Sequence, residues 1–423
     1  MHNRRDFMKA LGAGAAAASL GGCASLANSR GRVVVIGGGY GGATAAKYIR
    51  MWSDYAVDVT LVERNPLFIS CPVSNLVLAG YRSMADITLS YETLPKNHGV
   101  KLIRDEVIAI DPVKRRVTLM GGTVVAYDRL VVSPGVDFMY ESIPGLDNAE
   151  AQEQILHGWK AGPQTVALRA QLASMPDGGV YAIHIPKAPY RCPPGPYERA
   201  CQVASYFKAA KAKSKVIILD ANEDVVSKKG LFMKAWQDLY PGIIEYRPNS
   251  ELQDVDAKTR TARLIFGNVK ADVLNIVPPQ KAAKVAEDAG LINANKRWCE
   301  VDFTTFESTA HKNIHVLGDA ILAASLMPKS GHMANQHAKV AADAIVALLS
   351  GDAPNPGPVL NNTCYSFVSA TQAMHVASVH RYDPEKKTLL TVPGSGGVSS
   401  QASEQEASYA NGWAKNIWAD MLA

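Results

Sequence analysis

The sequence has little of what marks a fibrous, disordered or nucleic-acid-binding protein. Of its 423 residues, 7% are aromatic and 20% charged, and Lys and Arg outnumber Asp and Glu by only 44 to 39. A nucleic-acid interface needs a strong or clustered basic excess, so we predict no nucleic-acid partner. Glycine and proline, at 33 and 23 residues, stay near their usual frequency, which excludes collagen-like and low-complexity chains.

Long apolar runs and dense cysteines are also missing. Beyond the N-terminal segment, no stretch approaches the ~18 uninterrupted apolar residues that predict a membrane-spanning helix. Six cysteines are too few for a disulfide scaffold. No Cys-x-x-Cys-His haem motif occurs, and we predict no metal site. The length of 423 residues predicts two or three globular domains, and the hydrophobic fraction of 47% is enough to build more than one core.

Residues 1–29 are predicted to be an export signal. Arg4–Lys9 contains a twin-arginine pair, and the weakly apolar stretch Ala10–Leu20 that follows is too short to span a membrane. We therefore expect twin-arginine export to the periplasm and removal of the segment. Cys23 ends a lipoprotein-like cleavage box, whereas Ser25–Ala27 offers an ordinary cleavage site, so a lipid anchor stays open.

A glycine-rich turn after a buried strand predicts a dinucleotide site. The strand Arg32–Ile36 runs directly into Gly37, Gly39 and Gly42 in the spacing G-x-G-x-x-G, and a helical pattern covers Ala43–Arg50. The first glycine permits the tight turn, the second lets a pyrophosphate approach the backbone, and the third lets helix and strand pack closely. The helix N-terminus adds partial positive charge for the phosphates.

Three further motifs indicate that the dinucleotide is FAD. Glu63 follows the second strand, 21 residues after the last glycine, where an acidic residue binds ribose hydroxyls. Asp319 ends a short apolar strand, like the aspartate that contacts the ribityl chain in flavoproteins of similar layout. Tyr127–Gly135 resembles the element at which the chain leaves the FAD domain of those enzymes. We expect an FAD domain made of residues 30–145 and 286–350.

Residues 146–285 are expected to form a second Rossmann-like fold without a nucleotide motif. Gly179–Ile185 and Lys215–Asp220 match its first two strands, but Ala188–Arg199 replaces the glycine motif and contains four prolines. Proline lacks a backbone donor and fixes φ, so this turn cannot cradle a pyrophosphate. The sequence therefore argues against an NAD(P)H-dependent reductase.

The cysteines supply the remaining chemistry. Cys192 lies in the proline-rich turn before a predicted helix and beside Arg191, two features that favour a thiolate. Cys71 lies eight residues beyond Glu63, where related disulfide reductases carry two cysteines. A single thiol there is either packed in the core or attached to the flavin as a thioether. Cys201 and Cys299 are expected to be buried packing residues.

Five segments carry a resemblance to a known family: Cys192–Ala200, Asp302–Ser308, His311–Asp319, Met327–Gly331 and Asn362–Ser366. They resemble the flavoprotein subunit of flavocytochrome c sulfide dehydrogenase, in the superfamily of sulfide:quinone oxidoreductases and disulfide reductases. The similarity extends from about Arg32 to the C-terminus.

The resemblance implies roles for five residues. Cys71 matches the cysteine that tethers FAD covalently, and Cys192 and Cys364 match a redox-active disulfide. Glu198 matches a carboxylate near that disulfide and is a candidate proton acceptor, although a first-turn acid is also typical of a solvated side chain. Trp413 matches an aromatic residue close to the flavin; alternatively it is a core residue of the last helix.

The resemblance also implies the fold and the reaction. The expected fold is α/β, with two Rossmann-like domains, the FAD domain being split by the second. A C-terminal α+β domain, residues 357–423, would cover the flavin and dock a cytochrome. Sulfide would attack the disulfide, and the flavin would pass single electrons to a c-type haem on a separate subunit.

Two alternatives remain open on the sequence. A sulfide:quinone oxidoreductase would need an apolar, membrane-dipping C-terminus. Ser399–Ala423 is instead polar, with apolar residues at helical spacing, which favours packing on the body or on a cytochrome. A non-catalytic FAD-containing subunit of a sulfur-oxidising complex would need neither Cys192 nor Cys364.

Overall fold

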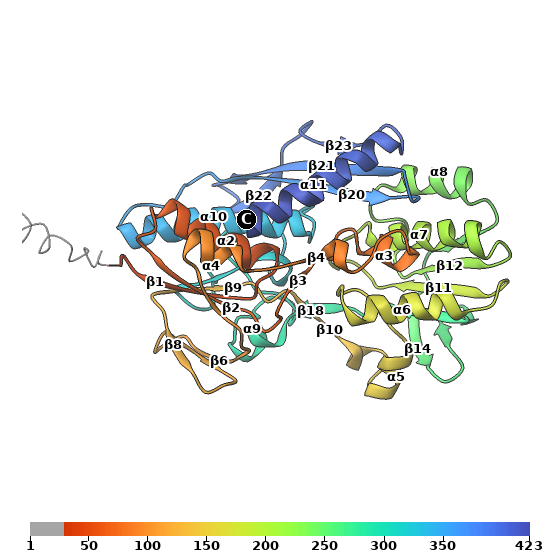
Figure 1. The fold of residues 1–423 in the computed structure, drawn as a ribbon, viewed down its shortest axis with the longest axis horizontal. Coiled ribbons are helices and arrows are strands. Elements are labelled where there is room, and N and C mark those ends of the chain that lie inside the picture. Colours follow the sequence, from red (N-terminus) through yellow and green to blue (C-terminus); the bar gives the residue numbers. More distant parts are fainter. Residues whose placement is uncertain (1–28) are drawn as a thin grey trace, which may run out of the picture.

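The computed structural model describes residues 29–423, and the predicted signal with its Cys23 lies outside them. Figure 1 shows two parallel sheets at opposite ends of an elongated molecule. The C-terminal segment, drawn in dark blue, lies along the top of the molecule over its middle. The expected α/β fold with Rossmann-like sheets is confirmed, whereas the exact domain boundaries stay a prediction.

The first sheet has five parallel strands in the order β19-β9-β1-β2-β5. Its strands are β1 (Arg32–Ile36), β2 (Asp58–Val62), β5 (Lys101–Ile103), β9 (Arg129–Val132) and β19 (Ile314–Val316). The three central strands are rich in buried Val, Leu and Ile, as expected for parallel strands covered on both faces. The edge strand β19 lies far downstream in the sequence, after all the strands of the second sheet.

Two helices cover one face of this sheet and meet each other. Helix α2 (Tyr40–Trp52) follows β1, and α10 (Gly331–Ser350) packs against it. Both helices carry buried alanines along the contact, which allow a close approach. Helices α3 (Ser74–Ala79), α4 (Thr93–His98) and α9 (Lys284–Asp288) are short, as are the 3₁₀ turns η1 (Ala85–Ile87) and η3 (Gly318–Ala320).

The second sheet has four parallel strands in the order β13-β12-β11-β17. They are β11 (Val180–Ile185), β12 (Lys215–Asp220), β13 (Ile244–Arg247) and β17 (Val273–Ile276). Around them lie α5 (Ala149–Gln154), α6 (Pro163–Ser174), α7 (Gly195–Ala210), α8 (Lys229–Leu239) and the turn η2 (Tyr140–Ser142).

Smaller antiparallel elements connect and decorate the two sheets. A two-stranded ladder between β10 (Val136–Phe138) and β18 (Gln280–Ala282) lies where the chain passes between them. The others are β3 (Phe68–Ile69) with β4 (Thr88–Leu89); β6 (Val107–Asp111), β7 (Arg116–Leu119) and β8 (Val124–Ala126); and β14 (Leu252–Asp256), β15 (Thr261–Leu264) and β16 (Gly267–Lys270).

The C-terminal layer consists of an antiparallel sheet and one long helix. Its strands are β20 (Val359–Phe367), β21 (Ala373–Asp383), β22 (Thr388–Thr391) and β23 (Gly397–Val398), and its helix is α11 (Glu404–Leu422). Strand β20 contacts both α10 of the first part and α7 of the second. The layer therefore lies against both sheets' helices and brings β20 to the space between them.

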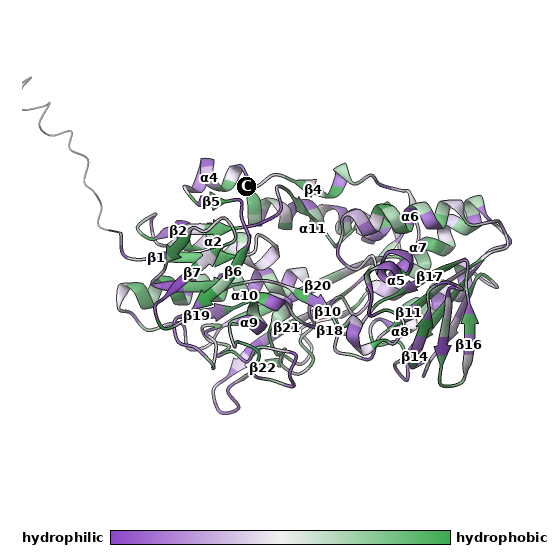
Figure 2. Cartoon of the chain, turned by 90° about the horizontal axis from the view of Figure 1, so that it is seen from below, coloured by the Kyte–Doolittle hydropathy of each residue, from purple (hydrophilic) through white to green (hydrophobic). Residues whose placement is uncertain are grey.

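Helix α11 packs on the body of the protein, as its apolar spacing predicts. Ile417, Trp418 and Met421 are 6%, 7% and 0% exposed, and the Trp418 indole donates to the Tyr40 hydroxyl at 3.1 Å. Figure 2 shows polar and apolar residues mixed along the helix. From residue 29 onward, the structure contains no helix long and apolar enough to cross a membrane.

Candidate functional site

The glycine turn after β1 leaves room for a pyrophosphate. Gly37 has φ = 91°, a left-handed conformation that glycine adopts without strain. A Cβ on Gly42 would lie 1.8 Å from the Gly37 carbonyl oxygen, so only glycine lets α2 approach the turn. A Cβ on Gly39 would meet no atom within 4 Å. Gly37 thus permits the tight turn, Gly39 leaves the backbone open to a pyrophosphate, and Gly42 lets the helix pack closely, as the sequence predicts.

Two acidic side chains fit the hydroxyl-bearing parts of FAD. Glu63 follows β2, and its Oε2 accepts from the Gly38 amide at 2.6 Å, which holds the carboxylate beside the turn. Asp319 lies in η3 after β19, and its Oδ1 is shielded from solvent without a hydrogen-bond partner in residues 29–423. Burial raises the pKa of Asp319. An unpaired buried acceptor suits a ribityl hydroxyl donor, so the residues present fit FAD.

The acidic residue at the corresponding position of the second sheet bonds to side chains of its own domain. Asp220 ends β12, as Glu63 follows β2, but it accepts hydrogen bonds from the hydroxyls of Tyr197 at 2.7 Å and Tyr246 at 3.0 Å. Asn222 donates to its other oxygen. Asp220 therefore bonds to side chains of its own domain, and the proline-rich turn before α7 lacks the glycines that a pyrophosphate needs.

Cys192 lies at the start of that helix in a left-handed conformation with φ = 58°. Its amide donates to the Lys329 carbonyl at 2.8 Å, and its carbonyl accepts from the Gly195 amide at 2.9 Å. Such backbone outliers in non-glycine residues concentrate at functional sites, where the surrounding structure imposes them. Here the bonds on both sides fix the direction of the Cys192 sulfur.

The expectation that Cys192 has a lowered thiol pKa is wrong for the reduced protein. Burial raises the pKa of Cys192 to about 12, and the negative charges of Cys364 and Glu198 raise it further than Arg191 and Lys228 lower it. Lost hydration of the thiolate therefore outweighs the adjacent cation and the helix terminus.

The structure brings Cys192, Glu198 and Cys364 together from three segments. Both cysteines are thiols in the structure, and they lie close enough for a charge on Cys364 to raise the pKa of Cys192. Glu198 Oε1 accepts at 3.0 Å from the amide of Phe367, on the same strand as Cys364. The disulfide itself stays a prediction.

Glu198 is buried rather than solvated, so the alternative of an exposed first-turn acid is wrong. Its exposure is 7%, and burial raises its pKa, against the opposing effect of the hydrogen bonds from Phe367 and Asn75. A buried carboxyl whose pKa is raised is a stronger proton acceptor than a solvated one, as a group that takes a proton from sulfur must be.

Cys71 lies apart from this cluster, under the guanidinium of Arg191. Arg191 Nη2 donates to the Cys71 sulfur at 3.0 Å, and the Ala161 amide donates to it at 3.4 Å. Arg191 also donates to the Trp159 carbonyl. The cation that the sequence places beside Cys192 is therefore turned toward Cys71, the predicted flavin tether.

Sequence reasoning missed three buried polar residues of the cluster. Asn75, at the start of α3, donates to Glu198 Oε2 at 3.0 Å and accepts from Arg199 Nε at 3.1 Å. Lys228 donates to the Cys364 carbonyl at 2.9 Å. All three are under 9% exposed. Their only local signal is polar residues at the ends of predicted strands and helices, which is common in any α/β protein.

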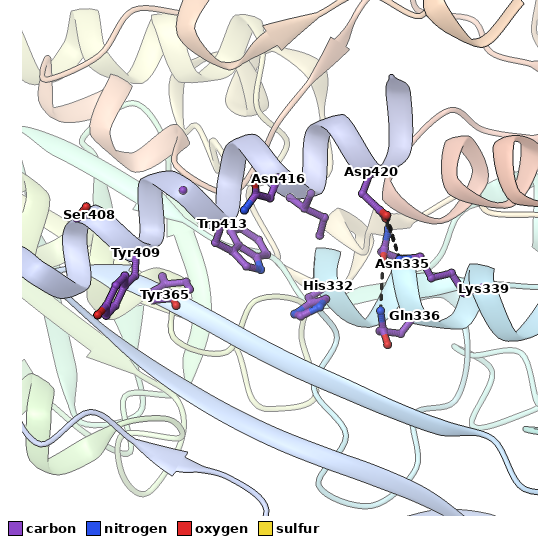
Figure 3. Close-up of a pocket in the computed structure, with 12 residues that line it drawn as sticks. His332, Asn335, Gln336, Lys339, Tyr365, Ser408, Tyr409, Trp413, Asn416 and Asp420 are labelled. Carbon is purple, nitrogen blue, oxygen red and sulfur yellow. Dashed lines mark hydrogen bonds and ion pairs between the residues drawn. The ribbon is translucent and has the colours of Figure 1, made fainter. Parts of the chain in front are cut away.

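Trp413 lines an open pocket of about 570 Å³ between α10, β20 and α11. Figure 3 shows its indole facing the pocket near His332 and Tyr365, with ring centroids 6.0 and 6.2 Å away. Asp420 closes one end of the pocket through an ion pair with Lys339 at 3.0 Å. Trp413 is thus a half-buried wall residue rather than part of the packed stripe of α11.

Cys201 and Cys299 take no part in these groups. Both are 0% exposed, and burial raises the thiol pKa of Cys299 to about 12 and that of Cys201 further. Both are packing residues, as the sequence predicts. Within residues 29–423, no three His, Cys, Asp or Glu side chains are grouped so that they could hold a metal ion.

Four family models match the chain. Residues 165–278 match "Sulfide dehydrogenase [flavocytochrome c] flavoprotein chain, central", and residues 356–422 match "Flavocytochrome c sulphide dehydrogenase, flavin-binding". Residues 31–173 match "Pyridine nucleotide-disulphide oxidoreductase". Residues 1–21 match the twin-arginine translocation pathway signal sequence, which supports export to the periplasm.

Similar proteins are found among curated sequences and solved structures. The sulfide dehydrogenase [flavocytochrome c] flavoprotein chain of Chlorobaculum thiosulfatiphilum is 56% identical over 46 residues, 11% of this chain and 94% of that sequence. Mouse mitochondrial sulfide:quinone oxidoreductase is 23% identical over 308 residues. That match spans 68% of this chain but only 65% of the mouse protein.

The fold itself is shared with a solved structure. Sulfide:quinone oxidoreductase from Aquifex aeolicus superposes with a TM-score of 0.70 at 20% identity, covering 92% of this chain and 91% of the other. This likeness covers nearly the whole length of both chains and shows that they share a fold.

Proposed function

Because the chain belongs to the family of flavocytochrome c sulfide dehydrogenase flavoprotein chains, we propose that it oxidises sulfide to sulfur or polysulfide with bound FAD. Sulfide reduces a Cys192–Cys364 disulfide, and the electrons then pass through the flavin to a separate c-type cytochrome. The observation that carries the proposal is the group of two half-buried cysteines and the buried Glu198, assembled from the turn before α7, from α7 and from β20.

Each residue of the group has a defined task. Hydrosulfide attacks the disulfide, and one cysteine keeps the added sulfur while the other is released as a thiolate. Glu198 accepts the proton from the attacking sulfur, because burial raises its pKa and so makes its carboxylate a stronger base. The Phe367 amide and Asn75 keep the carboxylate in place.

FAD, when bound, supplies an acceptor for two electrons from sulfur and releases them one at a time. Gly37, Gly39, Gly42 and Glu63 would hold its dinucleotide, and Asp319 its ribityl chain. We propose that Cys71 is the covalent attachment point and that Trp413 covers the flavin. The former is supported by the hydrogen bonds from Arg191 and Ala161, which hold the Cys71 sulfur in one position.

Two features argue against other electron carriers. The turn between β11 and α7 carries prolines in place of the glycine motif, so the second sheet has no pyrophosphate cradle for NADH. Ile417, Trp418 and Met421 of α11 are buried against the body and are not free to enter a membrane for quinone. A cytochrome docked on the C-terminal layer is therefore the favoured acceptor. A lipid anchor at Cys23 stays a prediction.

The direct test is sulfide-driven reduction of cytochrome c by the exported protein purified with its partner. Quinone and NADH serve as alternative substrates, and Cys364→Ser provides the inactive reference with the flavin retained. Activity with NADH, or quinone reduction in the absence of any haem protein, would contradict the proposal. If Cys364→Ser oxidised sulfide as fast as the wild-type protein, the disulfide would have no part in the reaction.

A further inference from the structure

Lys228 is a buried lysine for which the proposed sulfide reaction has no role. It precedes α8 in a left-handed conformation with φ = 54°, and it is 7% exposed. Lysines are almost never this buried unless they have a partner. Its position and contacts should therefore show what the ammonium group balances.

The topology places Lys228 next to the redox cysteines. Cys192 follows β11 and Lys228 follows β12, two neighbouring parallel strands of the second sheet. The carboxyl ends of such strands form the edge at which α/β folds bind ligands. Here that edge faces β20, which carries Cys364.

The ammonium group is bonded directly to the strand of the second cysteine. Lys228 Nζ donates to the Cys364 carbonyl oxygen at 2.9 Å and to the Ser366 hydroxyl at 2.8 Å. The Cys364 sulfur also has Asn362 Nδ2 at 3.4 Å. Lys228 thus contacts the backbone of Cys364 and the side chain of Ser366, and it holds its charge beside Cys364.

The ionisable groups that act most strongly on Lys228 are acidic. They are Cys364 on β20, Glu198 on α7, Cys192 in the turn before α7, and Glu406 on α11. Burial lowers the pKa of Lys228 to about 8, and these four groups oppose that shift. Near neutral pH the side chain is therefore a cation surrounded by groups that become negative.

We propose that Lys228 carries the positive charge that stabilises the anion on Cys364 when the Cys192–Cys364 disulfide opens. This inference rests on the proposed sulfide reaction. As hydrosulfide forms a new S–S bond to Cys192, the electron pair of the broken bond stays on Cys364. The hydrosulfide proton passes to Glu198, so the step transfers one unit of negative charge to Cys364, and Lys228 keeps its proton throughout.

Lys228 is on this view a positioning residue, since it contacts the backbone of Cys364 and acts on its sulfur through charge. Asn362 adds a neutral donor to the same sulfur. The thiol of Cys364 should therefore ionise more readily than a neutral side chain at position 228 would allow. Cys192, whose backbone is bonded to Lys329 instead, should depend less on Lys228.

The test measures the reactivity of each thiol separately in the mature, FAD-containing protein. The pair is reduced with dithiothreitol, the reductant is removed, and iodoacetamide is added at pH 8. Mass spectrometry then gives the alkylation rates of Cys364 and Cys192. Because a shift of one pKa unit changes the thiolate fraction tenfold, Lys228→Met should slow Cys364 about tenfold and Cys192 less.

Two further variants and a control separate charge from structure. Lys228→Arg should restore most of the Cys364 rate, whereas Lys228→Gln, which keeps a donor without the charge, should not. The control is Lys211→Met, since Lys211 is also buried but donates to the carbonyls of Leu172, Ala173 and Met175. It should leave both rates unchanged.

Three results would overturn the inference: an unchanged Cys364 rate in Lys228→Met, a larger effect on Cys192 than on Cys364, or full rescue by Lys228→Gln. The assay needs no turnover with sulfide. A wild-type protein that fails to oxidise sulfide would therefore refute the proposed function while the alkylation result would still decide the role of Lys228.

Discussion

Asn75 should control the protonation of Glu198, and its removal should move the pH dependence of sulfide oxidation. The two residues are 8% and 7% exposed, so water cannot replace a lost donor. In Asn75→Ala, Glu198 Oε2 loses the amide donor at 3.0 Å. A hydrogen bond to a charged group contributes about 1.5–3 kcal/mol, which corresponds to about 1–2 pKa units.

The sign of the shift follows from which form the amide stabilises. Burial already raises the pKa of Glu198, and the Asn75 donor opposes that rise by favouring the carboxylate. Without it the carboxylate appears only at higher pH. If Glu198 accepts the proton, the acidic limb of the rate profile for cytochrome c reduction by sulfide should move about 1–2 units toward alkaline pH.

The assay is the rate of cytochrome c reduction at saturating sulfide between about pH 5 and 9. Asn97→Ala is the matched control, because Asn97 lies on the surface of α4 and its side chain bonds to no described residue. Asn75→Ala should also lower the free energy of unfolding by about 1–3 kcal/mol, since Arg199 loses an acceptor. An acidic limb that stays in place in a folded Asn75→Ala protein would refute the assignment of Glu198 as proton acceptor.

Three other substitutions test the remaining parts of the site. Gly42→Ala should prevent FAD binding and destabilise the fold, because its Cβ would lie 1.8 Å from a backbone oxygen. Gly39→Ala should instead fold normally and lose only affinity for FAD. Measurements of flavin content and of thermal unfolding distinguish the two outcomes. The Cys71→Ser protein should show no flavin fluorescence in its band on a denaturing gel, whereas the wild-type band should fluoresce. A wild-type band without fluorescence would reject the tether. The free energy of unfolding should fall as pH rises through the raised pKa of Glu198, and a Glu198→Gln protein with the same slope would show that another group is responsible.

The parts of the site that the sequence predicts are those formed by neighbouring residues. The turn at Gly37, Gly39 and Gly42 and the position of Glu63 depend on local strand and helix patterns, and the structure places all of them together. The burial of the α11 stripe follows from its spacing in the same way.

The parts that the sequence could not supply depend on segments far apart in the chain. Lys228, Asn75 and Cys364 come from three different elements, and nothing in their local sequence shows that they meet. The pKa of Cys192 was misjudged for the same reason. Its neighbours in sequence favour a thiolate, but burial by distant segments decides the outcome.

The edge strand β19 has a consequence for when the protein can be exported. It pairs with β9 through Ile314 and Leu130, and Asp319 follows it directly, so the first sheet and the FAD site are incomplete until synthesis has passed the whole second sheet. Closing so long a loop is slow compared with local folding. The twin-arginine signal at residues 1–21 is made first, yet that pathway carries folded proteins. Cells depleted of flavin, or chains truncated before Ile314, should therefore accumulate this protein in the cytoplasm with its signal still attached.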